Sequence, residues 1–224
     1  DIDLLYGNEG LLPLDTFARF SQNPQWRTQL SAPAETIMLA LNTAKSPTRE
    51  LAVREALNYA VDKKPLIDSA LYGTQKVADT LFAPSVPYAN IGLTPRQYDP
   101  KHATELLDKA GWTLPAGKTM REKAGQPLQL ELAFVGTDAL SKSIAEIIQA
   151  NLRDIGVDVA LVGEEESSID ARQRDGRFSM IFNRTWGAPY DPHAFMSSMR
   201  VPSHADYQAQ LGLPDKPLID KEIG

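Results

Sequence analysis

Short hydrophobic runs alternate along the chain with stretches in which apolar residues recur at helical spacing. The runs have the length of buried strands and cover residues 35–42, 128–135, 157–162 and 178–182. The clearest helical pattern is Ser141–Ile155, with Gly156 as its stop signal. Strands and helices that mix in this way predict an α/β fold.

Other patterns complete the predicted elements. A short strand is expected within residues 1–33. Further helices are predicted near 14–21, from Pro47 to Ala60, from Lys64 to Gly73, from Asp99 to Gly111 and over 164–174. Residues 120–123 and 128–135 are expected to pair as a hairpin across Ala124-Gly125-Gln126. Residues 74–98 read as an irregular connection.

Both ends of the chain suggest a fragment of a longer protein. It opens on Asp1 without a start methionine or signal-peptide pattern. It closes on 216–224, which read as the first turns of a helix. We therefore expect truncation at both ends, and missing targeting signals say nothing about location.

Composition excludes several classes of function. With 224 residues, 42% hydrophobic and 23% charged, the chain is ordinary for a globular protein with a sizeable core. A net charge of −6 and no basic patch argue against a nucleic-acid partner. The absence of cysteine excludes disulfides, zinc fingers and thiol nucleophiles. No apolar run approaches the roughly 18 residues of a membrane span.

Side chains that carry chemistry concentrate between Asn183 and His204. This segment holds Trp186 and two of the three histidines, His193 and His204. Prolines and a glycine interrupt it, so we expect an ordered loop rather than a long element. Aromatic, imidazole and carboxylate groups on a loop indicate a site for a small ligand. The alternative is a structural turn in which Trp186 and Phe195 fill the core.

Three segments, taken together and in order, resemble the dipeptide/oligopeptide/nickel family of extracytoplasmic solute-binding proteins. They are Val53–Lys63, Tyr98–Trp112, and the strand Ser179–Asn183 followed by Trp186 and Asp191-Pro192. Each alone is an ordinary amphipathic helix or loop. The resemblance implies two lobes around a cleft, with 1–33 as the end of the first lobe and the crossover. Residues 34–224 would be an incomplete second lobe, a mixed sheet flanked by helices in the manner of periplasmic binding proteins.

Within the family, the nickel-binding members are the most similar. This implies a periplasmic substrate-binding component, not an enzyme, that captures nickel(II) and delivers it to the membrane subunits of an ABC importer. The resemblance places the metal contact at His204, and nickel(II) favours imidazole nitrogen in mixed nitrogen and oxygen sites. His193 is interpreted as structural, and His102 has no obvious metal-binding neighbour.

One histidine cannot saturate a nickel ion. The chain has no histidine pair at i, i+4, so the other donors must come from the missing lobe, from water or from a small chelator. We prefer a chelator, with free histidine or a polycarboxylate as candidates. Trp186 and Tyr190 can form flat walls, and the Tyr190 hydroxyl can bind a carboxylate. Arg174 can pair with a chelator carboxylate or, alternatively, lie on a solvated helix face.

The chain departs from the family pattern at two places, and two other functions are alternatives to nickel binding. Peptide-binding relatives usually carry an aspartate where this chain has Gly187–Tyr190, which weakens a di- or oligopeptide-binding alternative. Nickel-binding relatives tend to have tyrosine where this chain has Asp170, so a ligand contact is expected to differ. A metal-dependent hydrolase using Asp191, His193 and His204 is the less favoured alternative, because no His-Glu-x-x-His pattern is present.

Overall fold

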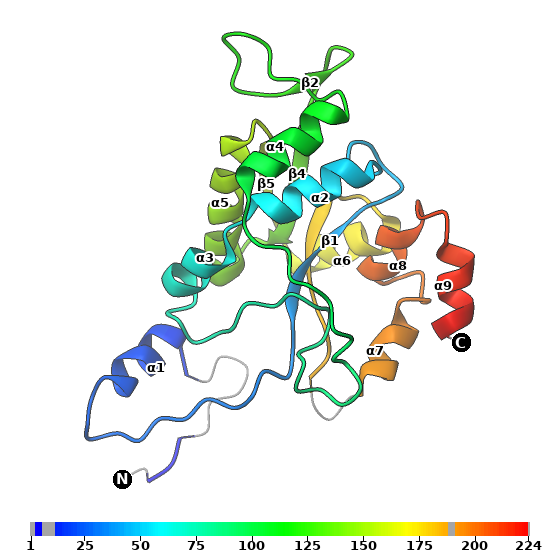
Figure 1. Cartoon of the computed structure of the whole chain (residues 1–224). Helices are drawn as coiled ribbons and strands as arrows, with labels where there is room; N and C mark the ends of the chain where they lie inside the picture. Colours follow the sequence, from blue (N-terminus) through cyan, green and yellow to red (C-terminus); the bar gives the residue numbers. More distant parts are fainter. Residues whose placement is uncertain (1–2, 6–11, 188–190, 224) are drawn as a thin grey trace.

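The computed structural model describes residues 3–5, 12–187 and 191–223. Its centre is a mixed sheet with the strand order β1-β6-β4-β5 (Figure 1). β1 (Ile37–Leu41) runs antiparallel to β6 (Met180–Arg184). β4 (Gln129–Val135) lies between β6 and β5 (Asp158–Glu164) and is parallel to both. The predicted α/β class is confirmed.

Helices cover both faces of this sheet (Figure 1). One face carries α2 (Leu51–Ala60), α3 (Lys63–Ala70), α4 (Pro100–Lys109) and α5 (Ala139–Asp154). The other carries α6 (Glu166–Asp175) and α8 (Ala205–Gln210). Along β4, Leu132 packs into the core of the first face and Ala133 into that of the second, because successive strand residues point to opposite sides. From Leu132 onward, both faces of β4 are therefore covered.

Arg121 ties the end of α5 to the end of α4. Its guanidinium donates to the carbonyl oxygens of Ile155 at 2.8 Å and Trp112 at 2.6 Å, and to the Asp108 carboxylate at 2.5 Å. Gly156, which follows Ile155, has a positive φ of 83°. A Cβ there would lie 2.8 Å from the Cγ of Arg121. The predicted glycine stop therefore also makes room for this buried arginine.

Two predicted elements differ from the structure. Residues 47–50 form a turn, and α2 begins only at Leu51. The reason is that the Thr48 hydroxyl donates to the carbonyl of Asn42 at 2.6 Å, which holds the turn against the end of β1. The predicted hairpin is limited to β2 (Glu122–Lys123) and β3 (Gln126–Pro127). The run 128–135 instead supplies β4, because its residues from Leu132 onward are apolar on both faces and fill a central position in the sheet.

The predicted helix near residues 14–21 and the irregular connection over 74–98 are both confirmed. The only regular element among the described residues of 1–33 is α1 (Leu14–Ser21), as predicted, so the expected short strand is not among them. No residue of α1 is buried, and Figure 1 shows it set apart from the sheet. Residues 74–98 contain neither helix nor strand, which confirms the irregular connection.

The C-terminal part is more helical than expected. The predicted loop contains α7 (Pro192–Ser198), begun by Asp191, whose carboxylate accepts from the backbone N–H of Ala194 at 2.8 Å. The final pattern forms α9 (Lys216–Ile223), as predicted. None of the described helices is both long and apolar enough to cross a lipid bilayer.

Candidate functional site

The candidate site begins where β6 ends. Thr185, which is 1% exposed, makes two hydrogen bonds with Thr36, the residue before β1. The Thr36 N–H donates to the Thr185 hydroxyl at 2.9 Å, and the Thr185 N–H donates to the Thr36 carbonyl at 3.0 Å. These bonds extend the pairing of β1 and β6 beyond the strands themselves. They fix the backbone immediately before Trp186.

Trp186 packs against a pair of aromatic rings, of which Phe195 is buried and Phe82 is half-buried. Its ring meets that of Phe195 on α7 edge to face at 5.9 Å, and Phe195 in turn meets Phe82 of the 74–98 connection at 5.9 Å. Phe195 is 2% exposed, whereas Trp186 is 37% exposed. The structural-turn alternative is thus correct for Phe195, which fills the core. Trp186 keeps part of its indole on the surface.

His204 stands next to this indole. The two ring centroids are 6.2 Å apart with an interplanar angle of 57°. His204 is the residue that precedes α8, but its side chain makes no capping hydrogen bond. The imidazole is half-buried. The structure therefore brings together two of the predicted site residues, Trp186 and His204.

A buried carboxylate lies two residues beyond His204. Asp206 is 8% exposed, and one of its oxygens accepts a hydrogen bond of 2.6 Å from the side-chain amide of Asn183. Burial raises the pKa of Asp206 above its ordinary value, while the hydrogen bond from Asn183 and the nearby His204 oppose that rise. Neither Asn183 nor Asp206 is among the site residues that the sequence predicts. The signal present was an acidic residue in the first turn of a helix after a candidate ligand.

Arg174 lies at the C-terminal end of α6. Its guanidinium approaches the carboxylate of the adjacent Asp175 at 3.7 Å, and its side chain is 60% exposed. Its carbonyl accepts a hydrogen bond of 2.8 Å from Gln208 on α8. α6 ends near the start of β6, whereas Trp186 follows the end of that strand. The pairing of Arg174 with a chelator carboxylate stays a prediction.

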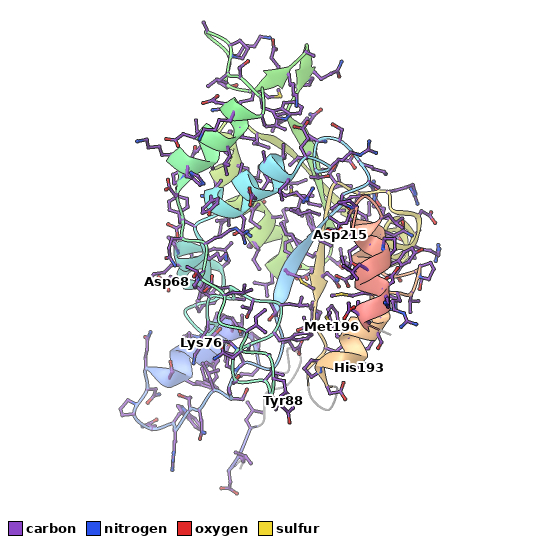
Figure 2. All side chains as sticks on the ribbon, turned by 45° about the vertical axis from the view of Figure 1, so that its right-hand side comes forward. Asp68, Lys76, Tyr88, His193, Met196 and Asp215 are labelled. Carbon is purple, nitrogen blue, oxygen red and sulfur yellow. The ribbon has the colours of Figure 1, made fainter. Side chains whose placement is uncertain are left out.

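The other candidate residues occupy varied positions. Tyr190 lies outside the described residues. Figure 2 shows His193 on α7, and its ring nitrogen Nδ1 lies 3.3 Å from the hydroxyl of Ser197 on the same helix. His102 is in the first turn of α4 and contacts the ring of Tyr59 edge to face at 4.7 Å. Asp170 is exposed on α6.

The described residues contain no preformed metal cage. No group of three or more histidine, aspartate or glutamate side chains among them is arranged to hold a metal ion. His204 is thus a single imidazole beside an aromatic wall. Such an arrangement can fill one position of a metal whose other positions are already taken.

Comparison with known proteins identifies the family. Residues 9–207 match the model of bacterial extracellular solute-binding proteins, family 5. The chain is 82% identical over all 224 residues to the nickel-binding periplasmic protein of Escherichia coli K12, and it spans 43% of that protein. The chain therefore covers less than half the length of this relative.

Two solved structures are similar to the whole or most of the chain. NikA from Brucella suis, in complex with Fe(III)-EDTA, has a TM-score of 0.95 and 67% identity over 100% of this chain and 45% of its own. NikZ from Campylobacter jejuni, in complex with Ni(L-His), has a TM-score of 0.66 and 28% identity over 78% of this chain and 36% of its own. With its α/β sheet and its match over residues 9–207, the chain belongs to family 5 of the bacterial extracellular solute-binding proteins.

Proposed function

We propose that this chain forms one wall of the binding site in a periplasmic nickel-binding protein that serves an ABC importer. Its ligand is nickel(II) already held by a small organic chelator. The relative from E. coli is a nickel-binding periplasmic protein. The similar structures from B. suis and C. jejuni hold Fe(III)-EDTA and Ni(L-His), which are both metal chelates.

The observation that carries the proposal is the contact of His204 with Trp186. A lone imidazole supplies one donor nitrogen, and no further cluster of metal ligands lies among the described residues. A chelator would fill most of the coordination positions and leave one for the imidazole. The exposed part of the Trp186 indole offers an apolar wall against which a compact organic chelator can pack.

The proposed chelator is histidine or a polycarboxylate. Either one carries a carboxylate, which Tyr190 and Arg174 are proposed to bind through a hydroxyl and a guanidinium. Ligand capture and delivery need no chemical step, so the protein acts as a binding component rather than an enzyme. The hydrolase alternative would need His193 at the site, but the ring of His193 lies beside Ser197 on its own helix α7.

The wider arrangement follows from the family. Residues 34–224 would form most of the second lobe, and 1–33 would be the end of the first lobe and the crossover. The ligand would be enclosed when two lobes close, and the closed form would be recognised by the membrane subunits. With one wall of such a cleft, the 224-residue chain is expected to bind the chelate weakly, because half of the contacts are absent.

The test is an NMR titration of the isotope-labelled chain with nickel(II), with and without excess free histidine. We expect perturbed signals at His204 and at the Trp186 indole only when histidine is present, and loss of the Trp186 response in His204→Ala. A dipeptide added in excess should not compete. Equal responses without histidine, or responses centred on His102 or His193, would contradict capture of a chelate. Competition by the dipeptide would favour the peptide-binding alternative.

A further inference from the structure

One side-chain pair joins the two segments that carry Trp186 and His204. The amide nitrogen of Asn183 donates to the Asp206 carboxylate at 2.6 Å. Asn183 stands three residues before Trp186 on the chain, and Asp206 two residues after His204. We propose that Asn183 and Asp206 are positioning residues that hold the His204 imidazole against Trp186 in the geometry that receives the nickel chelate. This inference rests on the proposed function.

Asn183 is held at both ends of its amide group. While its nitrogen donates to Asp206, its oxygen accepts from the backbone N–H of Arg184 at 2.9 Å. Because side chains alternate along a strand, Asn183 points to the face of β6 that α8 covers, and Arg184 points to the other. The guanidinium of Arg184 accordingly lies near Glu35, at 3.9 Å from its carboxylate. The orientation of the Asn183 amide is therefore fixed from within β6.

Asp206 needs this partner because it is buried. Removing a carboxylate from water costs free energy unless hydrogen-bond donors replace the lost hydration. The amide of Asn183 is the side-chain donor to Asp206 among the described residues. A hydrogen bond to an ionised acceptor is both stronger and more directional than one between neutral groups. The first turn of α8 is thereby fixed relative to β6.

Among the described residues, the His204 imidazole has no such anchor of its own. The backbone N–H of His204 donates to the carbonyl of Val201 at 3.0 Å, and its side chain does not cap α8. The position of the imidazole therefore depends on where the first turn of α8 is held. Displacement of that turn would move the ring away from Trp186.

The far end of α8 is secured separately. The N–H of Thr43 donates to the carbonyl of Ala209 at 2.9 Å, and the Gly212 N–H donates to the Thr43 hydroxyl at 3.0 Å. The Gln208 amide reaches the carbonyls of Pro202 at 2.9 Å and Arg174 at 2.8 Å. Among the hydrogen bonds of the described residues, only that between Asn183 and Asp206 joins α8 directly to β6. Loss of this bond should thus loosen the His204 end while α8 stays attached.

The test replaces both partners by leucine, which has a similar branched shape. Removing one partner would leave a buried group unpaired, whereas apolar replacement of both can be nearly neutral for stability. The double variant Asn183→Leu/Asp206→Leu therefore separates positioning from folding. The control is Gln129→Met/Asp158→Leu, which removes an exposed amide–carboxylate bond of 2.8 Å between β4 and β5. That bond lies where β4 and β5 begin, away from Trp186.

The first readout needs no metal. In the wild type and in the control, nuclear Overhauser contacts between the rings of Trp186 and His204 should be present, and in the leucine pair they should be lost. The second readout is the apparent affinity for nickel(II) with excess histidine. It should fall by about tenfold in the leucine pair, the loss expected for one hydrogen bond to a charged group, and stay unchanged in the control.

A third readout separates positioning from general damage. Fe(III)-EDTA, in which the chelator itself supplies the donors, should bind the leucine pair as it binds the wild type, because it does not need the imidazole. Asp206→Asn keeps an acceptor oxygen for Asn183 and should preserve both the ring contact and the nickel affinity. If the leucine pair does not fold, Asn183→Ala replaces it, since a small cavity lets water reach Asp206.

Two results would overturn the proposal. One is an intact contact of Trp186 with His204, or unchanged nickel affinity, after removal of the pair. The other is equal loss in Asp206→Asn, where the hydrogen bond can still form. Failure of the proposed function is distinct, because the wild type itself would then show no histidine-dependent nickel response. The metal-free ring contact would still report whether the pair positions His204.

Discussion

Replacement of Arg121 by methionine is expected to destabilise the fold strongly. Its side chain is 4% exposed and makes three hydrogen bonds, two of them to backbone carbonyls. Methionine retains an unbranched apolar stem of similar length but has no N–H donors. Arg121→Met therefore removes these hydrogen bonds while it preserves most of the packing. The carbonyls of Ile155 and Trp112 would lose the guanidinium as their partner.

The magnitude follows from these two carbonyls. Ile155 and Trp112 are each 4% exposed, so water cannot easily replace the guanidinium. A buried acceptor left unsatisfied costs about 1–3 kcal/mol. The bond to Asp108 adds little, because the Asp108 side chain is 53% exposed and water can solvate it. Release of a buried charge offsets part of the loss, which leaves a net decrease in unfolding free energy of about 3 kcal/mol.

The assay is urea unfolding followed by circular dichroism. The midpoint should fall without a change in the m-value, and the melting temperature should fall by about 6–12 °C. The control is Arg153→Met on the exposed side of α5, for which we expect a change within about 0.5 kcal/mol. A similar loss in both variants, or a loss below about 1 kcal/mol for Arg121→Met, would refute the reasoning from buried carbonyls.

Three further predictions concern other positions. Gly212→Ala should lower the unfolding free energy by about 2 kcal/mol or more in urea denaturation, because a Cβ there would collide with the backbone carbonyl of Thr43; an unchanged midpoint would contradict this. Asp138→Ala should cost about 1 kcal/mol at neutral pH, since Asp138 accepts from the N–H groups of Leu140 and Ser141 at the start of α5. Burial opposes ionisation of Asp138, but the hydrogen bonds from the Ser141 hydroxyl and these N–H groups lower its pKa. The loss of stability in Asp138→Ala should therefore shrink as pH falls through the ordinary aspartate range. A loss that does not depend on pH would contradict this. Burial instead raises the pKa of Asp206, so its contribution to stability is lost as pH rises. The urea midpoint of Asp206→Asn should therefore increase relative to that of the wild type from acidic to neutral pH. A decrease in this relative midpoint would contradict the reasoning.

The fold was largely predictable where one local signal dominates. Asp99-Pro100 combines a capping side chain with proline at the first helical position, and the Asp99 carboxylate indeed accepts from the His102 N–H at 2.9 Å. Gly156 ends α5 with a positive φ, as its position after the apolar pattern indicated. The predictions are wrong where contacts between residues far apart in the sequence determine the local structure. The turn at 47–50 depends on Thr48 reaching Asn42, and the pairing of 128–135 depends on strands far along the chain.

The candidate site was predictable only in part for the same reason. The residue types around Trp186 and His204 pointed to a ligand site, and the resemblance to a family selected His204. The contact between the two rings depends on α8 folding back along β6, which no local pattern reveals. The bond between Asn183 and Asp206 likewise spans two elements. A carboxylate in the first turn of a helix is usually solvated, so the burial of Asp206 could not be inferred from its position in the sequence.

The central claim is that His204 is the protein ligand of a nickel chelate. The most direct test compares His204→Ala with His193→Ala, a histidine on the neighbouring helix α7, by NMR-derived affinity for nickel(II) in excess histidine. We expect His204→Ala to lose at least about tenfold in affinity, as expected for removal of a metal-binding nitrogen, and His193→Ala to stay within about twofold of the wild type. Equal losses in the two variants, or an unchanged affinity in His204→Ala, would contradict it.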